Sequence, residues 1–70
     1  MTHKERTLDY IRQFGSITSL DAFKDLGNTR LSATIYALRK EGYNIVSIRE
    51  KAKNRFDEDT YYDRYYLVDD

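Results

Sequence analysis

The N-terminal part of the chain repeats apolar positions with the period of an α-helix. Three apolar residues recur at intervals of three, with charged and amide side chains between them: Leu8, Ile11 and Phe14. This pattern predicts an amphipathic helix over Thr2–Phe14. Thr2, with Glu5 three residues later, is suited to cap its start, and Gly15 is suited to end it.

Two further helices follow with short connections. Residues 16–18 predict a connector that can form one rung of strand, with Ile17 pointing inward. The second helix starts at Thr18 or Ser19, in a segment that resembles a capping box with Asp21 in place of glutamate, and it stops at Gly27. Its predicted buried stripe consists of Leu20, Phe23 and Leu26.

The third helix is predicted from Thr29 to about Glu41, with Asn28 as its N-cap and Gly42 as its C-terminal stop. Its inner face carries residues spaced four and three apart: Leu31, Ile35 and Leu38. The tight junction at Gly27 and Asn28 between two helices is typical of a helix-turn-helix.

After Gly42 the period changes and predicts a hairpin. Tyr43–Arg49 is rich in β-branched residues, Glu50–Thr60 is polar, and Tyr61–Val68 forms the second strand. We expect Ile45, Tyr65 and Leu67 to face inward. The alternation of side chains along the strand also allows Val46 and Ile48 to face inward instead, and a β-bulge would let both sets do so. Of the four tyrosines at 61, 62, 65 and 66, we expect two in the core and two facing outward.

The order of these elements predicts an α+β fold, a winged helix-turn-helix of three helices and a two-stranded wing. One contiguous core is expected from the shared periodicity: Leu8, Ile11, Phe14, Ile17, Leu20, Phe23, Leu26, Leu31, Ile35, Leu38, Ile45 and Leu67. With no spare helix for a dimer interface, we expect a monomer in dilute solution that can pair on DNA.

Composition narrows the function classes. The 70 residues make one domain, 1–70, and 40% of them are hydrophobic, which is too many for a disordered chain. The sequence has no cysteine, no signal peptide and no long apolar run, so we expect a cytoplasmic protein without membrane contact. The 12 basic and 12 acidic residues give zero net charge, so attraction for nucleic acid depends on how charge is distributed.

The outer face of the third helix has no acidic residue. Projected at about 100° per residue, it carries Thr29, Arg30, Ala33, Tyr36, Ala37 and Lys40. Small residues permit close approach to a major groove, and Arg30 can reach guanine or phosphate. Solvated helix faces also carry arginine, lysine and threonine, but the missing acids favour DNA binding.

The wing supplies a second set of candidates. Lys51, Lys53, Asn54 and Arg55, together with Arg49, can hold a phosphate backbone or enter a minor groove. The acidic run 57–59 follows directly and opposes that role, which leaves a plain salt-bridged hairpin as the alternative.

Catalysis and cofactors find no support. His3 is the only histidine, there is no cysteine nucleophile or glycine-rich phosphate loop, and the run 57–59 lacks the spacing of a calcium site. We therefore expect no enzyme activity, no metal and no cofactor.

The residues from Gly27 to Val46 resemble a known family. The stretch Gly-Asn-Thr-Arg-Leu-Ser, then Ile-Tyr-x-Leu-Arg-Lys-x-Gly-Tyr-x-Ile, is similar to small winged-helix domains of bacteriophages and prophages, and Arg64–Leu67 also fits. The resemblance implies double-stranded DNA as partner and a role in transcription regulation inside a bacterial host. The acidic wing departs from the family, and docking on a host or phage protein through the tyrosine-rich hairpin is the alternative function.

Overall fold

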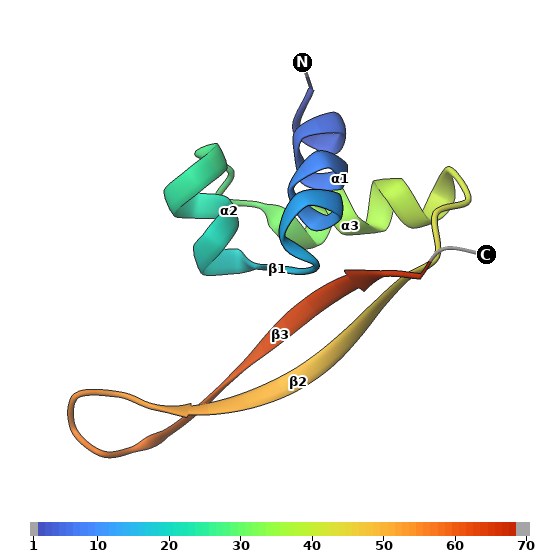
Figure 1. Cartoon of the computed structure of the whole chain (residues 1–70). Coiled ribbons are helices and arrows are strands. Elements are labelled where there is room, and N and C mark those ends of the chain that lie inside the picture. Colours follow the sequence, from blue (N-terminus) through green and yellow to red (C-terminus); the bar gives the residue numbers. More distant parts are fainter. Residues whose placement is uncertain (1, 69–70) are drawn as a thin grey trace.

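A computed structural model of the chain describes residues 2–68 and contains the predicted elements (Figure 1). Three helices precede a long hairpin, and a short strand between the first two helices joins its sheet. The elements are α1 His3–Phe14, β1 Ile17–Thr18, α2 Ser19–Leu26, α3 Leu31–Lys40, β2 Ile45–Lys53 and β3 Asp59–Leu67. This arrangement confirms the winged helix-turn-helix, including the extra strand at Ile17.

The ends of α1 and α2 are closed by the residues that the sequence indicated. Thr2 Oγ1 accepts a hydrogen bond from the N–H of Glu5 at 3.2 Å, and Gly15 ends α1 with a left-handed φ of 92°. Thr18 and Asp21 form a reciprocal capping box at the start of α2, because each side chain accepts from the other residue's backbone N–H. The capping predictions at both helix starts are therefore confirmed.

The predicted inner face of α2 is wrong. Leu20 and Phe23 are 64% and 58% exposed, whereas Ala22 is fully buried. Ala22 lies one turn before Leu26, which packs against the core, so the inward face is the one that carries the small side chain. A small residue lets α2 lie close to its neighbours, and the bulky side chains then point to solvent.

The sheet has the antiparallel order β1-β3-β2, and its register is continuous. Residue pairs run without a bulge from Ile45 opposite Leu67 to Lys53 opposite Asp59. The predicted phase is confirmed, because Ile45 is buried while Val46 and Ile48 are exposed. No bulge forms between β2 and β3, because Val46 and Ile48 lie on the outer face of the sheet.

The hairpin is longer than predicted, and the loop expected at 50–60 is wrong. Both strands contain nine residues, and only residues 54–58 connect them. Residues 49–53 and 59–63, most of them polar, continue the strand pairing, and ion pairs between their side chains cross the ladder. Hydrophobic periodicity does not report such a polar extension. The ribbon therefore extends well beyond the helices (Figure 1).

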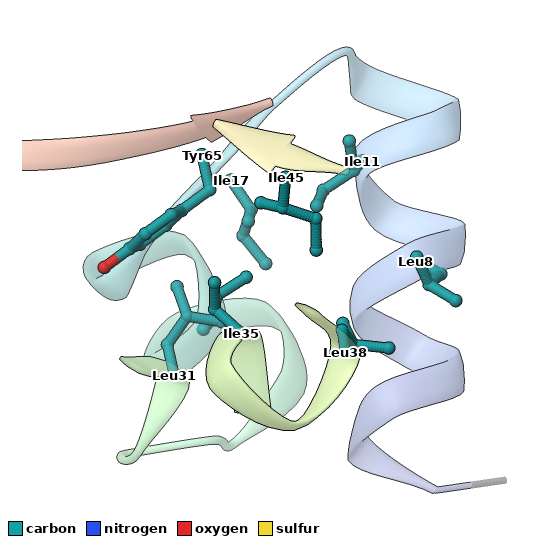
Figure 2. Packing of buried hydrophobic residues seen from close by; sticks show 9 residues of the cluster. Leu8, Ile11, Ile17, Leu31, Ile35, Leu38, Ile45 and Tyr65 are labelled. Carbon is teal, nitrogen blue, oxygen red and sulfur yellow. The ribbon is translucent and has the colours of Figure 1, made fainter. Parts of the chain in front are cut away.

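The core gathers between the helices and the near end of the sheet (Figure 2). Phe14 is an error in the predicted core: it is 63% exposed and packs its ring on Tyr10, with centroids 4.6 Å apart. Tyr65 takes an inner position on β3 instead. The buried apolar cluster consists of Leu8, Ile11, Ile17, Ala22, Leu31, Ile35, Leu38, Ile45 and Tyr65.

Candidate nucleic-acid interface

The turn between α2 and α3 is organised by Asn28, which is only 4% exposed. Its Oδ1 accepts a hydrogen bond from the N–H of Arg30 at 2.9 Å, and its Nδ2 donates to Thr34 Oγ1 at 3.0 Å. The N–H of Asn28 donates to the carbonyl of Ala22 at 3.0 Å. These bonds occupy both ends of the side-chain amide, so Asn28 positions the turn instead of facing a ligand.

The predicted start of the third helix is wrong by two residues. The helix begins at Leu31, and Arg30, with φ −129° and ψ 52°, is the residue before it. Asn28 is therefore not the N-cap, although its side chain does hold a backbone N–H. The hydrogen bond from the N–H of Arg30 to Asn28 Oδ1 keeps Thr29 and Arg30 in a turn ahead of the helix.

The two faces of α3 divide as the sequence predicted. Leu31, Ile35 and Leu38 are each no more than 2% exposed and anchor the helix in the core. The candidate contact residues within the helix lie on the opposite side and are exposed, apart from the half-buried Ala37: Ala33, Tyr36, Ala37 and Lys40. Thr29 and Arg30 are exposed in the turn before the helix. The structure therefore brings the α3 part of the predicted site together on one helix face.

Two side chains at the C-terminal end of α3 have further contacts. The ammonium of Lys40 lies 5.2 Å from the centre of the Tyr36 ring, a cation–π distance, and Tyr36 is 61% exposed. Arg39 donates from Nε to the carbonyl of Ile45 at 2.9 Å. Arg39 therefore links α3 to β2, a structural role that its position in the sequence did not reveal.

The wing brings its lysines beside its acids, not beside α3. Lys51 Nζ lies 3.2 Å from Asp59 Oδ2, and Lys53 Nζ lies 3.5 Å from Asp57 and 3.6 Å from Asp59. Arg49 Nε lies 3.5 Å from Asp63. Such exposed pairs stabilise the fold little, but they do cancel the local field that attracts phosphate.

The loop at the tip of the wing is shaped by Asn54. Its Oδ1 accepts hydrogen bonds from the N–H groups of Phe56 at 2.9 Å and Glu58 at 3.1 Å. Asp57 adopts a left-handed φ of 62°. Among residues 2–68, Arg55 is the one wing cation with no ion pair, and Phe56 beside it is 74% exposed.

Arg64 joins the wing to the helical body. It donates from Nε to Glu50 Oε1 at 2.8 Å and from a terminal nitrogen to Ser16 Oγ at 3.0 Å. The bond from Arg64 holds the pKa of the Glu50 carboxyl below its ordinary value, and Glu50 in turn raises the pKa of Arg64. Both groups therefore remain charged over a wide pH range, which fixes the base of the wing.

The tyrosines divide by position along β3. Tyr65 is buried and Tyr66 is half-buried, while Tyr61 and Tyr62 are 61% and 36% exposed. Tyr65 belongs to the buried cluster but Tyr66 does not, so the expectation of two core tyrosines is confirmed for Tyr65 and wrong for the second one. Phe56, by contrast, was missed as a surface residue of interest, although its place between charged residues in a loop was a usable signal.

The described part of the chain also bears on metal binding and membrane crossing. No group of three histidine, cysteine, aspartate or glutamate side chains within residues 2–68 could hold a metal ion. None of the helices formed by these residues is long and apolar enough to cross a membrane.

These features place the chain in a known class. It belongs to the winged helix-turn-helix domain family, whose model matches residues 2–70. The family has a fold associated with DNA binding and not with catalysis, which suggests DNA binding here. No curated protein and no solved structure matches the chain.

Proposed function

We propose that this protein binds double-stranded DNA with the outer face of α3 in the major groove. The observation that carries the proposal is the exposed side of α3, which has no acidic residue and presents Lys40 beside small side chains, with the exposed Arg30 in the turn just ahead of it. Ala33 and Ala37 leave room for base edges, and the two cations can meet guanine or phosphate.

The candidate residues have different roles in this proposal. Arg30, in the turn ahead of α3, contacts a base or a phosphate, with Thr29 beside it. Lys40, at the far end of the helix, contacts phosphate at the edge of the groove, and Tyr36 supports it through its ring. On the wing, Arg55 is the favoured contact, because Lys51 and Lys53 already face carboxylates.

A titration against random-sequence duplex DNA at low and moderate salt tests the proposal. Because phosphate contacts release counterions, binding should be measurable at low salt and should weaken steeply as salt rises. A folded protein that shows no duplex binding at low salt, where phosphate attraction is strongest, contradicts the proposal.

Arg30→Ala tests which surface binds. Loss of a base contact should weaken binding and relax preference at one position by about 1–3 kcal/mol. Arg12→Ala is the matched control, because it removes one exposed cation from α1, outside the candidate interface. Equal losses in the two variants would show that only total charge matters.

We further propose that the protein is a small phage-type transcription regulator in the bacterial cytoplasm and a monomer in dilute solution. The resemblance of residues 27–46 to phage winged-helix domains supports the first part. Selection of binding sites from random duplexes should enrich one motif; a pool without any preferred motif contradicts a regulatory role.

Sedimentation at micromolar concentration should give the monomer mass, and a tight dimer contradicts the proposal that the protein is a monomer in dilute solution.

The alternative is a protein-interaction module that uses the hairpin. The exposed Tyr61 and Tyr62 favour it, since tyrosine is enriched in interfaces, and so does the near-neutral wing. The same titration separates the two functions: absence of duplex binding at low salt would direct the search to protein partners of the hairpin.

A further inference from the structure

The tip of the wing exposes an aromatic ring with no structural task in the described fold. Phe56 is 74% exposed, the highest fraction among the large hydrophobic residues, and it lies outside the core cluster. It sits at the end of the ribbon farthest from the helices (Figure 1). A side chain in that place contributes nothing to the packing of the core, and its ring is accessible to another molecule.

The backbone under this ring is held in one shape. Asn54 binds the N–H groups on either side of the turn apex, and the chain also closes through the N–H of Asn54, which donates to the carbonyl of Glu58 at 3.0 Å. A loop ordered before binding loses less entropy when its tip is immobilised on a partner.

The lysines along the shaft of the wing are in ion pairs, whereas Arg55 at its tip is in none within the described residues. Lys51 and Lys53 are paired with Asp57 and Asp59, so the shaft attracts phosphate weakly. Arg55 is exposed and forms no ion pair with any residue from 2 to 68. Within the described chain, the tip therefore offers an unpaired cation, Arg55, and an apolar ring, Phe56, next to the carboxylates of Asp57 and Glu58.

The length of the ribbon is sufficient to reach a second groove. Nine residues per strand at about 3.3 Å each span roughly 26 Å between the first and last residues. One turn of the duplex measures about 34 Å, so a major groove and the adjoining minor groove lie roughly 17 Å apart. The ribbon is therefore longer than the distance between adjoining grooves.

We propose that Phe56 is an apolar wedge that inserts between base pairs from the minor groove, with Arg55 contacting the groove beside it. The inference rests on the proposed DNA binding and adds a mode of action to it. Apolar side chains inserted in this way partly unstack a base step and bend the duplex, while arginine suits the electronegative groove. A protein would then bend the DNA that it binds, without base-specific contacts from the wing.

DNA topology gives a test that needs no known binding site. A closed-circular plasmid is relaxed by a topoisomerase with the protein bound, and its linking number is then measured. Insertion of a wedge unwinds the duplex locally, so the parent protein should shift the linking number. Phe56→Ala should abolish the shift while changing affinity for random duplex by less than about tenfold, because lost insertion is offset by the unstacking that no longer occurs.

Two controls make the outcome specific. Phe23→Ala removes another exposed phenylalanine, 58% accessible and on α2, and should leave the shift intact. Phe56→Leu keeps an apolar wedge and should keep most of the shift. Thermal melting should be the same for all four proteins, since neither ring is in the core.

The linking-number and binding results separate the wedge from DNA binding itself. Binding by the parent without any change in linking number overturns the wedge and leaves DNA binding in place, and so does an unchanged shift in Phe56→Ala. No duplex binding by the parent at low salt overturns both proposals.

Discussion

At the scale of single residues, two asparagines set the geometry of both candidate contact elements. Asn28 and Asn54 each place a side-chain oxygen on a backbone N–H two residues ahead, that of Arg30 or Phe56. This is the local mimicry of a backbone turn that asparagine provides. The sequence predicted Asn28 as a helix cap and Asn54 as a direct contact, because it does not show whether a side-chain amide is free or occupied.

Ile35 is the most informative position in the core. It is 1% exposed and lies at the centre of α3. We expect Ile35→Ala to lower the free energy of unfolding by about 2–5 kcal/mol, since it removes packed methylene groups and leaves a cavity. Urea denaturation measures the change.

Leu20→Ala is the matched control for this prediction. Leu20 has the same volume class but is 64% exposed, so its truncation should change stability by only a few tenths of a kcal/mol, in the range usual for surface positions. Comparable losses at the two positions would contradict the inner faces described for α2 and α3.

Tyr10 gives the fold a pH dependence in the alkaline range. Its hydroxyl donates to Asp25 Oδ2 at 2.7 Å, and that bond, followed by burial and nearby carboxylates, raises the pKa of Tyr10 from 10.0 to about 12. Because the folded-state pKa is the higher one, the stabilisation is complete below pH 10.0 and is lost as the pH rises towards 12.

The measurement compares unfolding free energy across that pH window in the parent and in Tyr10→Phe. The parent should lose stability more steeply than the variant, which has no hydroxyl to ionise. Tyr61→Phe removes an exposed hydroxyl and should follow the parent. Parallel curves for the parent and Tyr10→Phe would show that the bond to Asp25 does not form in solution.

At the scale of elements, the sequence predicts best where periodicity and caps agree. All three helices, the short strand and the hairpin are at the expected places, and Ile45 faces inward as predicted. Two failures have one origin. The stripe Leu20–Phe23 on α2 and the polar end of the wing were judged by hydrophobicity, but close packing of Ala22 and ion pairing across the ladder decided the outcome.

Gly27 tests the junction between α2 and α3. It has a left-handed φ of 66°, and a Cβ added there meets no atom within 4 Å, so substitution affects the backbone only. Gly27→Ala should therefore lower the unfolding free energy by about 1–2 kcal/mol. Gly27→Asn should lower it less, because asparagine tolerates this conformation better. Equal losses from alanine and asparagine in urea denaturation would contradict this account.

At the scale of the whole molecule, zero net charge hides an uneven distribution. The outer face of α3 carries cations without acids, while the wing carries both signs in pairs. Composition therefore gave an ambiguous prediction about DNA, and the sequence could place charges on α3 but could not show that the wing lysines meet Asp57 and Asp59. That pairing depends on strand register, which only the folded hairpin defines.

Salt dependence of duplex binding measures this distribution directly. Each phosphate neutralised by a cation contributes about 0.9 to the slope of log affinity against log salt. Lys40→Ala should reduce the slope by roughly one unit, because no carboxylate within residues 2–68 forms an ion pair with Lys40. Lys53→Ala should reduce it by much less, because Asp57 and Asp59 already neutralise the Lys53 ammonium.

Asp59→Asn provides the converse experiment on the same ribbon. It removes the carboxylate shared by Lys51 and Lys53, so Lys51 loses its partner while Lys53 keeps only Asp57, and the slope should grow steeper as Lys51 becomes available to phosphate. Circular dichroism checks that the hairpin is retained. If Asp59→Asn leaves the slope unchanged while Lys40→Ala reduces it, then the shaft of the wing lies away from the duplex and α3 alone supplies the electrostatic contact.

If Lys53→Ala reduces the slope as much as Lys40→Ala, then the ion pairs of the wing open when DNA binds. The paired carboxylates then serve to hold the lysines in position until phosphate replaces them.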